Sequence, residues 1–111
     1  MALDVQLKRG VLEICVLSAM LGEETYGYEL IKKVSPFIEI SESTLYPILR
    51  RLEASGSVNV RSAEHNGRLR KYYSITDEGR QKIKEFLTDW SEIIGIYDYI
   101  KGEYDGEKEI R

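Results

Sequence analysis

The pattern of hydrophobic and polar residues predicts three short helices, then a β-hairpin, then a long C-terminal helix. Residues 5 to 21 are apolar around most of a helical circumference, which indicates a helix buried on more than one side. Gly22 follows as a suitable C-terminal stop. The fold class expected from these elements is mainly α with a small β-hairpin.

A second helix is expected at residues 26 to 34, with Thr25 as its N-cap. Gly27 costs about 1 kcal/mol inside a helix, so its presence indicates close packing against another backbone. The residue before Pro36 resists the helical conformation and ends the helix. Residues 37–40 then alternate apolar and polar, which is consistent with a brief strand that joins the hairpin.

A third helix begins near Ser41 and ends before Gly56. Because of Pro47, the sequence does not decide at which residue this helix begins. If Thr44 is the N-cap, Pro47 is the third helical residue, where its missing N–H costs nothing. If the helix begins at Ser41, Pro47 lies deeper and distorts it slightly. The inward stripe at three- and four-residue spacing consists of Leu45, Ile48, Leu49 and Leu52. The residues left to face outward are Ser43, Thr44, Tyr46, Pro47, Arg50 and Arg51.

The β-hairpin is predicted from alternation on both sides of a turn. Val58 and Val60 alternate with polar residues, and residues 69 to 75 form the returning strand. His65-Asn66-Gly67 predicts a tight turn, because Asn-Gly is the strongest short hairpin signal. If Tyr73 and Ile75 face inward, the outer face of the returning strand carries Arg70, Tyr72 and Ser74.

The last helix begins after Thr76, a suitable N-cap followed by acidic residues that the helix dipole favours. The apolar residues beyond it recur as heptads, which predicts a helix that packs against a partner helix. The expected dimerisation residues are Ile83, Phe86, Trp90, Ile93, Tyr97 and Ile100. We expect a folded domain at residues 5–76, a dimerisation helix at 77–104 and a frayed tail at 105–111.

Length and composition limit the possible classes of protein. The 111 residues leave room for one domain with a modest core, which oligomerisation would supplement. No run of about 18 apolar residues and no signal-peptide pattern is present, so neither a membrane span nor secretion is expected. The lone Cys15 cannot form an internal disulfide, and its apolar surroundings indicate a buried thiol. We expect a cytoplasmic protein.

The net charge of −3 is distributed unevenly along the chain. Residues 41–73 carry six Arg or Lys and three Glu, whereas residues 1–40 and 77–111 are each net negative. The third helix and the hairpin are therefore the positive part of the chain. A local basic patch matters more for phosphate contact than the overall pI.

This order of elements suits a winged helix-turn-helix that contacts duplex DNA. A helix in the major groove exposes short polar groups near its N-terminus, while its inner stripe packs on its own domain. The contacts expected from the third helix are Ser43, Thr44, Tyr46, Arg50 and Arg51. Those expected from the hairpin, toward the minor groove or backbone, are Arg68, Arg70 and Lys71. The alternative is an ordinary amphipathic helix beside a solvated hairpin.

Other chemistry is not indicated by the sequence. No nucleophile, acid–base or nucleotide-binding motif is present, so no enzyme activity and no cofactor are expected. His65 has no second His or Cys nearby, and a structural metal site needs about four ligands, so no metal is expected. The rival function from another class is a protein-interaction module that docks through its C-terminal heptads and binds no specific DNA.

Several segments, taken jointly and in order, resemble the PadR family of bacterial transcriptional regulators. They are Thr25-Tyr26-Gly27-Tyr28-Glu29-Leu30, Ser43-Thr44-Leu45-Tyr46-Pro47-Ile48-Leu49-Arg50-Arg51-Leu52-Glu53 with Gly56, Arg70-Lys71-Tyr72-Tyr73, and Thr76-Asp77-Glu78-Gly79. The similarity covers roughly residues 8 to 100. It implies a winged helix-turn-helix, a homodimer joined through the C-terminal helix, and repression by binding a pseudo-palindromic operator. The single C-terminal helix is similar to that of the small PadR subclass.

The resemblance also implies DNA contacts at the matching positions. These are Tyr26, Ser43, Thr44, Tyr46, Arg50, Arg70 and Lys71. Ser43 departs from the family pattern, because many members carry glycine just before the Thr-Leu-Tyr. This departure changes a side chain expected to face DNA and leaves the operator sequence open.

Trp90 is the one tryptophan of the chain and occupies a heptad position. One interpretation is an interface aromatic, which is common where helices pack. The other comes from the resemblance: in similar small PadR members a tryptophan of this helix pairs across the dimer and sandwiches planar aromatic effectors. The residues expected to line such a site are Trp90, Leu87, Ile94, Ile14 and Ser18. The sequence leaves both interpretations open.

Overall fold

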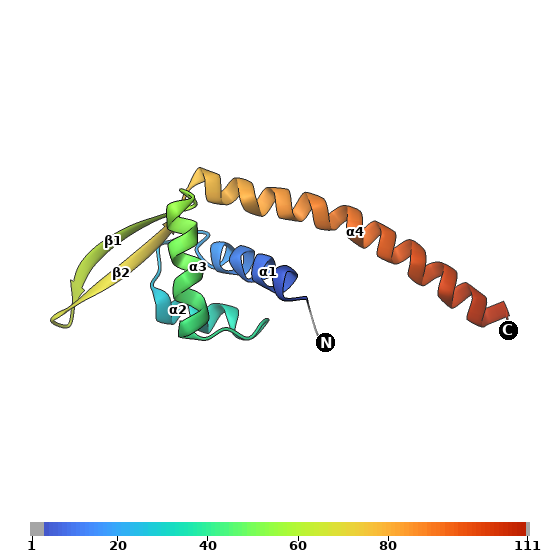
Figure 1. Ribbon diagram of the computed structural model, residues 1–111, viewed down its shortest axis with the longest axis horizontal. Helices are drawn as coiled ribbons and strands as arrows, with labels where there is room; N and C mark the ends of the chain where they lie inside the picture. Colours follow the sequence, from blue (N-terminus) through green and yellow to red (C-terminus); the bar gives the residue numbers. More distant parts are fainter. Residues whose placement is uncertain (1–3, 111) are drawn as a thin grey trace.

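The computed structural model describes residues 4–110. The elements in chain order are α1 (Val5–Ser18), α2 (Gly27–Val34), α3 (Glu42–Ala54), β1 (Val58–His65), β2 (Arg68–Ile75) and α4 (Asp77–Ile110). Figure 1 shows α1, α2 and α3 packed together, the hairpin projecting beside α3, and α4 passing over α1 and extending far beyond the rest. The predicted fold class, a winged helix-turn-helix with one long C-terminal helix, is confirmed.

The apolar core joins the three short helices to the base of the hairpin. Its buried members are Leu12, Val16, Leu17, Met20, Leu30, Val34, Ile40, Leu45, Ile48, Leu49, Leu52, Val58, Tyr73 and Ile75. The predicted inward stripe of α3 is buried in full, because residues three and four apart share one face of a helix. The opposite face of α3 is therefore left for solvent or a ligand.

The start of α2 differs from the prediction. Tyr26 is the N-cap residue, and no side chain caps the helix. Thr25, the predicted cap, is buried, and its backbone N–H and C=O pair with the backbone of Tyr73 at 3.0 and 2.7 Å. Thr25 thus forms an isolated β-bridge to β2, and this long-range pairing replaces the predicted capping role. The first helix also ends at Ser18, before the predicted residue 21.

The connector before α3 is irregular. The brief strand expected at residues 37–40 is absent, and the residue that bridges to the hairpin is Thr25 instead. Ser41 is the N-cap residue of α3, and its carbonyl accepts the N–H groups of Thr44 and Leu45 at 3.1 and 2.9 Å. Of the two starts left open, the earlier one is correct, so Pro47 lies within the helix.

The end of α3 is joined tightly to the start of α4. Gly56 has a φ of +74°, and the N–H groups of Gly56 and Ser57 donate to Glu53 and Leu52, a Schellman arrangement. The Thr76 hydroxyl accepts the Gly79 N–H at 3.1 Å, which confirms Thr76 as the cap of α4. The same hydroxyl donates to the Gly56 carbonyl at 2.6 Å, so one side chain links the two helix ends.

The hairpin turns where the sequence predicted, at Asn66 and Gly67. Asn66 and Gly67 both have positive φ, at 50° and 79°, as a type I′ turn requires. Tyr73 and Ile75 are buried, which confirms that they face inward. The returning strand begins at Arg68, one residue before the predicted start.

The long helix α4 runs without interruption to Ile110, and so extends through the described part of the stretch where a frayed tail was expected, 105–111. Gly102 does not break the helix, and Lys101 pairs with Asp105 one turn later at 2.7 Å. No helix among residues 4–110 is long and apolar enough to cross a membrane.

Candidate nucleic-acid interface

A cleft of 770 Å³ separates the outward face of α3 from the hairpin, and the first turn of α2 closes one end. We refer to it as the α3–hairpin cleft. Its lining residues are Tyr26, Gly27, Tyr28, Tyr46, Leu49, Arg50, Glu53, His65, Asn66, Arg68, Leu69, Arg70, Lys71 and Tyr73. It brings together residues from three elements that lie apart in the sequence.

The wall formed by α3 follows from helical spacing. Tyr46, Arg50 and Glu53 are four and three residues apart, so they share one face. Ser43 and Thr44 are exposed one turn earlier, and their hydroxyls lie 3.0 and 3.3 Å from the hydroxyl of Ser41. Three hydroxyl groups therefore gather at the N-terminus of α3, where the helix dipole favours an anion.

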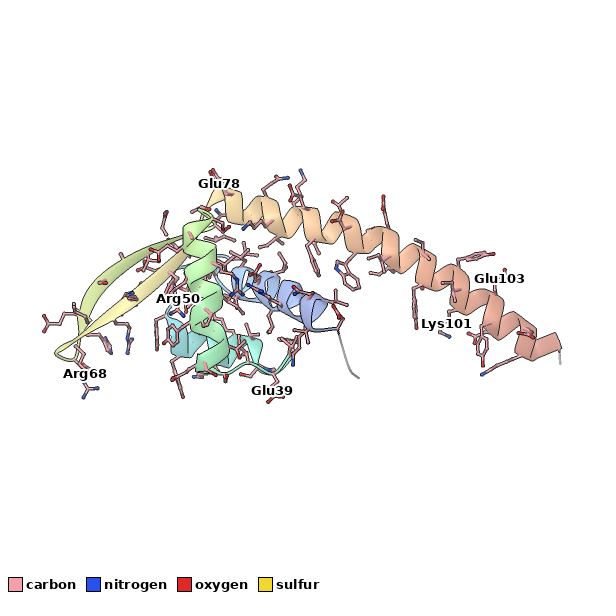
Figure 2. The ribbon with its side chains drawn as sticks, in the orientation of Figure 1. Glu39, Arg50, Arg68, Glu78, Lys101 and Glu103 are labelled. Atoms are coloured by element: carbon pink, nitrogen blue, oxygen red, sulfur yellow. The ribbon has the colours of Figure 1, made fainter. Side chains whose placement is uncertain are left out.

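The wall formed by the hairpin is basic. Arg68, Arg70 and Lys71 of β2 line the cleft, and Figure 2 shows Arg68 at the hairpin tip and Arg50 on the side of α3 nearest the hairpin. The guanidinium carbon of Arg70 lies 3.9 Å from the centre of the Tyr26 ring, a cation–π contact. Leu69 lies between these cations and is 81% exposed.

Gly27 lies in the cleft next to the side chain of Tyr46. A Cβ at this position would lie 2.6 Å from the phenol oxygen of Tyr46. The close neighbour of Gly27 is thus the end of a side chain, whereas close packing against another backbone was predicted. Beside it, burial raises the pKa of Tyr73, and nearby Tyr46 and Glu53 raise it further.

Ion pairs divide the basic residues of segment 41–73 into two groups. Arg51 pairs with Glu13 of α1 at 2.9 Å, and Arg61 pairs with Glu24. The hydrogen bond from Arg61 lowers the pKa of Glu24. Among residues 4–108, whose side chains the structure describes, the basic residues of this segment without an ion pair are Arg50, Arg68, Arg70 and Lys71. All four line the cleft, where they outnumber its one carboxylate, that of Glu53.

Arg51 is the predicted DNA contact that the structure does not bring to the cleft. Its half-exposed guanidinium binds Glu13 of α1 and does not line the cleft. Adjacent helical residues point about 100° apart, so Arg50 and Arg51 face different surroundings. The other predicted contacts either line the cleft or, like Ser43 and Thr44, lie at its α3 end.

Several residues that line the cleft were not predicted from the sequence. Gly27, Tyr28, Glu53 and Leu69 belong to the cleft without having been assigned to it. The spacing of Glu53 from Tyr46 and Arg50 places all three on one face of α3, so Glu53 could have been predicted from the sequence. Gly27 and Tyr28 were not predictable in this way, because their place depends on how α2 meets the hairpin.

The residues expected around Trp90 lie along α1 and α4. Trp90 is half-buried and its ring centre is 5.6 Å from that of Phe86. Ile14 and Ser18 are half-buried on α1, whereas Leu87 and Ile94 are 62% and 55% exposed on α4. Ile83 packs partly against the core of its own protomer. Within the described part of the chain, no group of His, Cys, Asp or Glu is arranged to hold a metal ion.

Known proteins resemble this chain in sequence. The model of the PadR-like transcriptional regulator family matches residues 16–85. A transcriptional regulator of Mycobacterium tuberculosis is 31% identical over 81 residues, which covers 72% of this chain and 76% of that protein.

Solved structures resemble it in fold as well. A PadR-like transcriptional regulator of Bacillus cereus is 35% identical with a TM-score of 0.72, over 86% of this chain and 95% of that one. Bacillus subtilis PadR in complex with operator DNA is 26% identical with a TM-score of 0.64, over 69% of this chain and 46% of that one. The family match spans more than half of the sequence, and this chain therefore belongs to the PadR-like family of transcriptional regulators.

Proposed function

We propose that this regulator is a repressor that binds a pseudo-palindromic DNA operator as a homodimer, with the α3–hairpin cleft of each protomer against the DNA. One observation carries the proposal. The four basic residues of segment 41–73 that have no ion pair among residues 4–108 all line this cleft. Phosphate contact is the interaction that such uncompensated charge favours most strongly.

In this proposal, some residues of the cleft recognise the base sequence and others bind the DNA backbone. The N-terminal turn of α3 presents Ser43, Thr44 and Tyr46 at the end of a helix that fits the major groove. Arg50 and the basic residues of β2 contact phosphates on either side. Bacillus subtilis PadR, which shares the fold, was solved with operator DNA, and this supports the same use of the cleft here.

The shape of the protomer supports a dimer. Its radius of gyration is 18.0 Å, whereas a compact chain of this length has about 13 Å. Its accessible surface of 8093 Å² exceeds the ~6,300 Å² typical of a monomer of this mass. Part of the excess is apolar surface on α4, where Ile93, Tyr97 and Ile100 are 47 to 59% exposed. A second copy of α4 packed along this heptad stripe would cover it.

In the dimer, α4 sets the distance between the two recognition helices. Half-sites on DNA are spaced about 34 Å apart or at a near equivalent, so a change in the packing of α4 changes DNA affinity. A planar aromatic effector bound near Trp90 would release the operator only by binding the non-DNA-binding arrangement more tightly.

The effector proposal is tested by the fluorescence of Trp90. Saturable quenching by members of a diverse panel of planar aromatic compounds is expected, because stacking on the indole perturbs its emission. If no compound quenches the emission, Trp90 is an interface aromatic and the effector part of the proposal fails.

The DNA proposal is tested by a mobility shift with the duplex upstream of the protein's own gene. The double variant Arg50→Ala, Arg70→Ala should lose most of the shift, while Arg80→Ala, Lys84→Ala removes two exposed charges outside the cleft and should retain it. Size-exclusion chromatography checks that both variants remain dimers. Unchanged DNA affinity of the first variant would favour the rival protein-interaction module instead.

A further inference from the structure

The outer face of the hairpin carries a row of charged and aromatic side chains. Backbone pairing sets Thr25 opposite Tyr73, and both side chains are buried. Because side chains alternate along a strand, Glu24 and Tyr26 lie on the other face, beside Tyr72. We name Glu24, Arg61, Tyr72, Tyr26 and Arg70 the outer-face stack.

Each member of the outer-face stack contacts the next. Glu24 accepts hydrogen bonds from the Nε of Arg61 at 2.9 and 3.1 Å. The Arg61 guanidinium carbon lies 4.7 Å from the centre of the Tyr72 ring. The rings of Tyr72 and Tyr26 meet edge-on, 6.0 Å apart and inclined by 75°. Arg70 lies over the other end, on the ring of Tyr26.

The two arginines of the stack differ in their electrostatics. The Arg61 hydrogen bond lowers the pKa of Glu24, and Glu24 raises the pKa of Arg61, so this pair is ionised and mutually neutralised. Arg70 has no carboxylate partner among residues 4–108. Its charge is held in place by a π-face, which leaves its N–H groups available for a phosphate.

We propose that Tyr72, Arg61 and Glu24 are positioning residues for DNA binding, which act by fixing the Tyr26 ring and, through it, the direction of Arg70. This inference rests on the proposed function of the cleft. A free arginine loses rotamer freedom when it binds a phosphate, and a stacked arginine has lost much of it already. Arg61, Tyr72 and Arg70 come from the hairpin, whereas Glu24 and Tyr26 come from the segment that leads into α2. The stack therefore also connects the hairpin to the start of α2.

A double-mutant cycle distinguishes positioning from a general structural role. The variants are Tyr72→Leu, Arg70→Ala and the combination, and the readout is affinity for the duplex upstream of the gene by fluorescence anisotropy. Tyr72→Leu should weaken binding about fivefold when Arg70 is present. It should have no further effect in the Arg70→Ala background, because its action passes through Arg70. A fivefold loss in both backgrounds would overturn the inference.

Conservative variants complete the experiment. Tyr72→Phe keeps the ring and should bind DNA like the wild type, whereas Arg61→Gln should weaken binding about twofold, again only when Arg70 is present. Arg61→Gln keeps the test valid if Tyr72→Leu does not fold. If Arg70→Ala itself leaves the affinity unchanged, the proposed function of the cleft fails; if Arg70→Ala weakens binding and neither stack variant does, only the positioning role fails.

Discussion

The Tyr46 side chain lies in the cleft directly against Gly27, which has no side chain. Its phenol oxygen occupies the space that a Cβ would need. Glycine in a helix is otherwise unfavourable relative to alanine, and at this position it leaves room for the Tyr46 side chain in the cleft. The sequence revealed that Gly27 is unusual, but the identity of its neighbour depends on the packing of α2 against α3.

We predict that Gly27→Ala lowers DNA affinity about fivefold, roughly the loss of one hydrogen bond, with little change in thermal stability. The reason is that Tyr46 must turn away to make room. Anisotropy titrations and thermal melts measure the two effects. Gly10→Ala is the matched control, because nothing lies within 4 Å of its added Cβ. Equal DNA affinity for both alanine variants would contradict the prediction.

Glu24 gives the outer-face stack a defined pH dependence. Its pKa is lowered below the ordinary value of 4.5 in the folded protein by the Arg61 hydrogen bond. The stabilisation is therefore present above pH 4.5 and is lost as the pH falls through the folded pKa. Glu24→Gln should melt at a slightly lower temperature than the wild type at pH 7, and the difference should shrink as the pH falls below 4.5 through the lowered pKa of Glu24. A difference that grows toward acid pH would show that another group is responsible.

At the scale of elements, the junction between α3 and α4 behaves as one unit. The Lys82 ammonium donates to the Ser55 hydroxyl at 2.9 Å, in addition to the Thr76 link to Gly56. A Cβ at Gly79 would collide with the carbonyl oxygen of Ser57 and lie 2.7 Å from Ile75. We therefore expect a change in the direction of α4 to shift α3 as well.

Gly79→Ala should destabilise the protein by about 1 to 3 kcal/mol, because the atom it meets belongs to the backbone and cannot rotate away. Denaturation in urea measures the change. Gly95→Ala is a stringent control: nothing surrounds its added Cβ, so it should stabilise α4 by up to about 1 kcal/mol. If both variants are stabilised alike, the tight junction at Gly79 does not exist.

Elements set by local patterns were predictable, and those set by distant pairing were not. The α3 stripe and the Asn-Gly turn depend on neighbours a few residues away, and both were correct. Thr25 was assigned to a helix cap because its strand partner, Tyr73, is nearly fifty residues later. Likewise, Arg51 was predicted to contact DNA, because its ion pair with Glu13 of another helix could not be foreseen from the sequence.

For the whole molecule, the long free portion of α4 is the feature that most requires a partner. Ile93→Glu should convert the dimer to a monomer, because a carboxylate on the heptad stripe cannot be buried unpaired. DNA affinity should then fall by roughly a hundredfold, since two linked contacts become one. Light scattering after size-exclusion chromatography gives the mass.

Tyr99→Glu is the control for Ile93→Glu. Tyr99 is 69% exposed and lies nine residues after Trp90, on the opposite side of the helix. The Tyr99→Glu variant should remain a dimer and bind DNA with wild-type affinity. A dimeric Ile93→Glu, or a monomeric Tyr99→Glu, would show that the heptad stripe is not the interface.

Whether the α3–hairpin cleft contacts DNA phosphates is tested most directly by the salt dependence of binding. The slope of log K against log salt changes by about 0.9 for each phosphate contact. The double variant Arg50→Ala, Arg70→Ala removes four such contacts from a dimer, so its slope should be shallower than that of the wild type by about 3 to 4. A slope and affinity equal to those of the wild type, in a variant that is folded and dimeric, would contradict the assignment of the cleft as the DNA-binding surface.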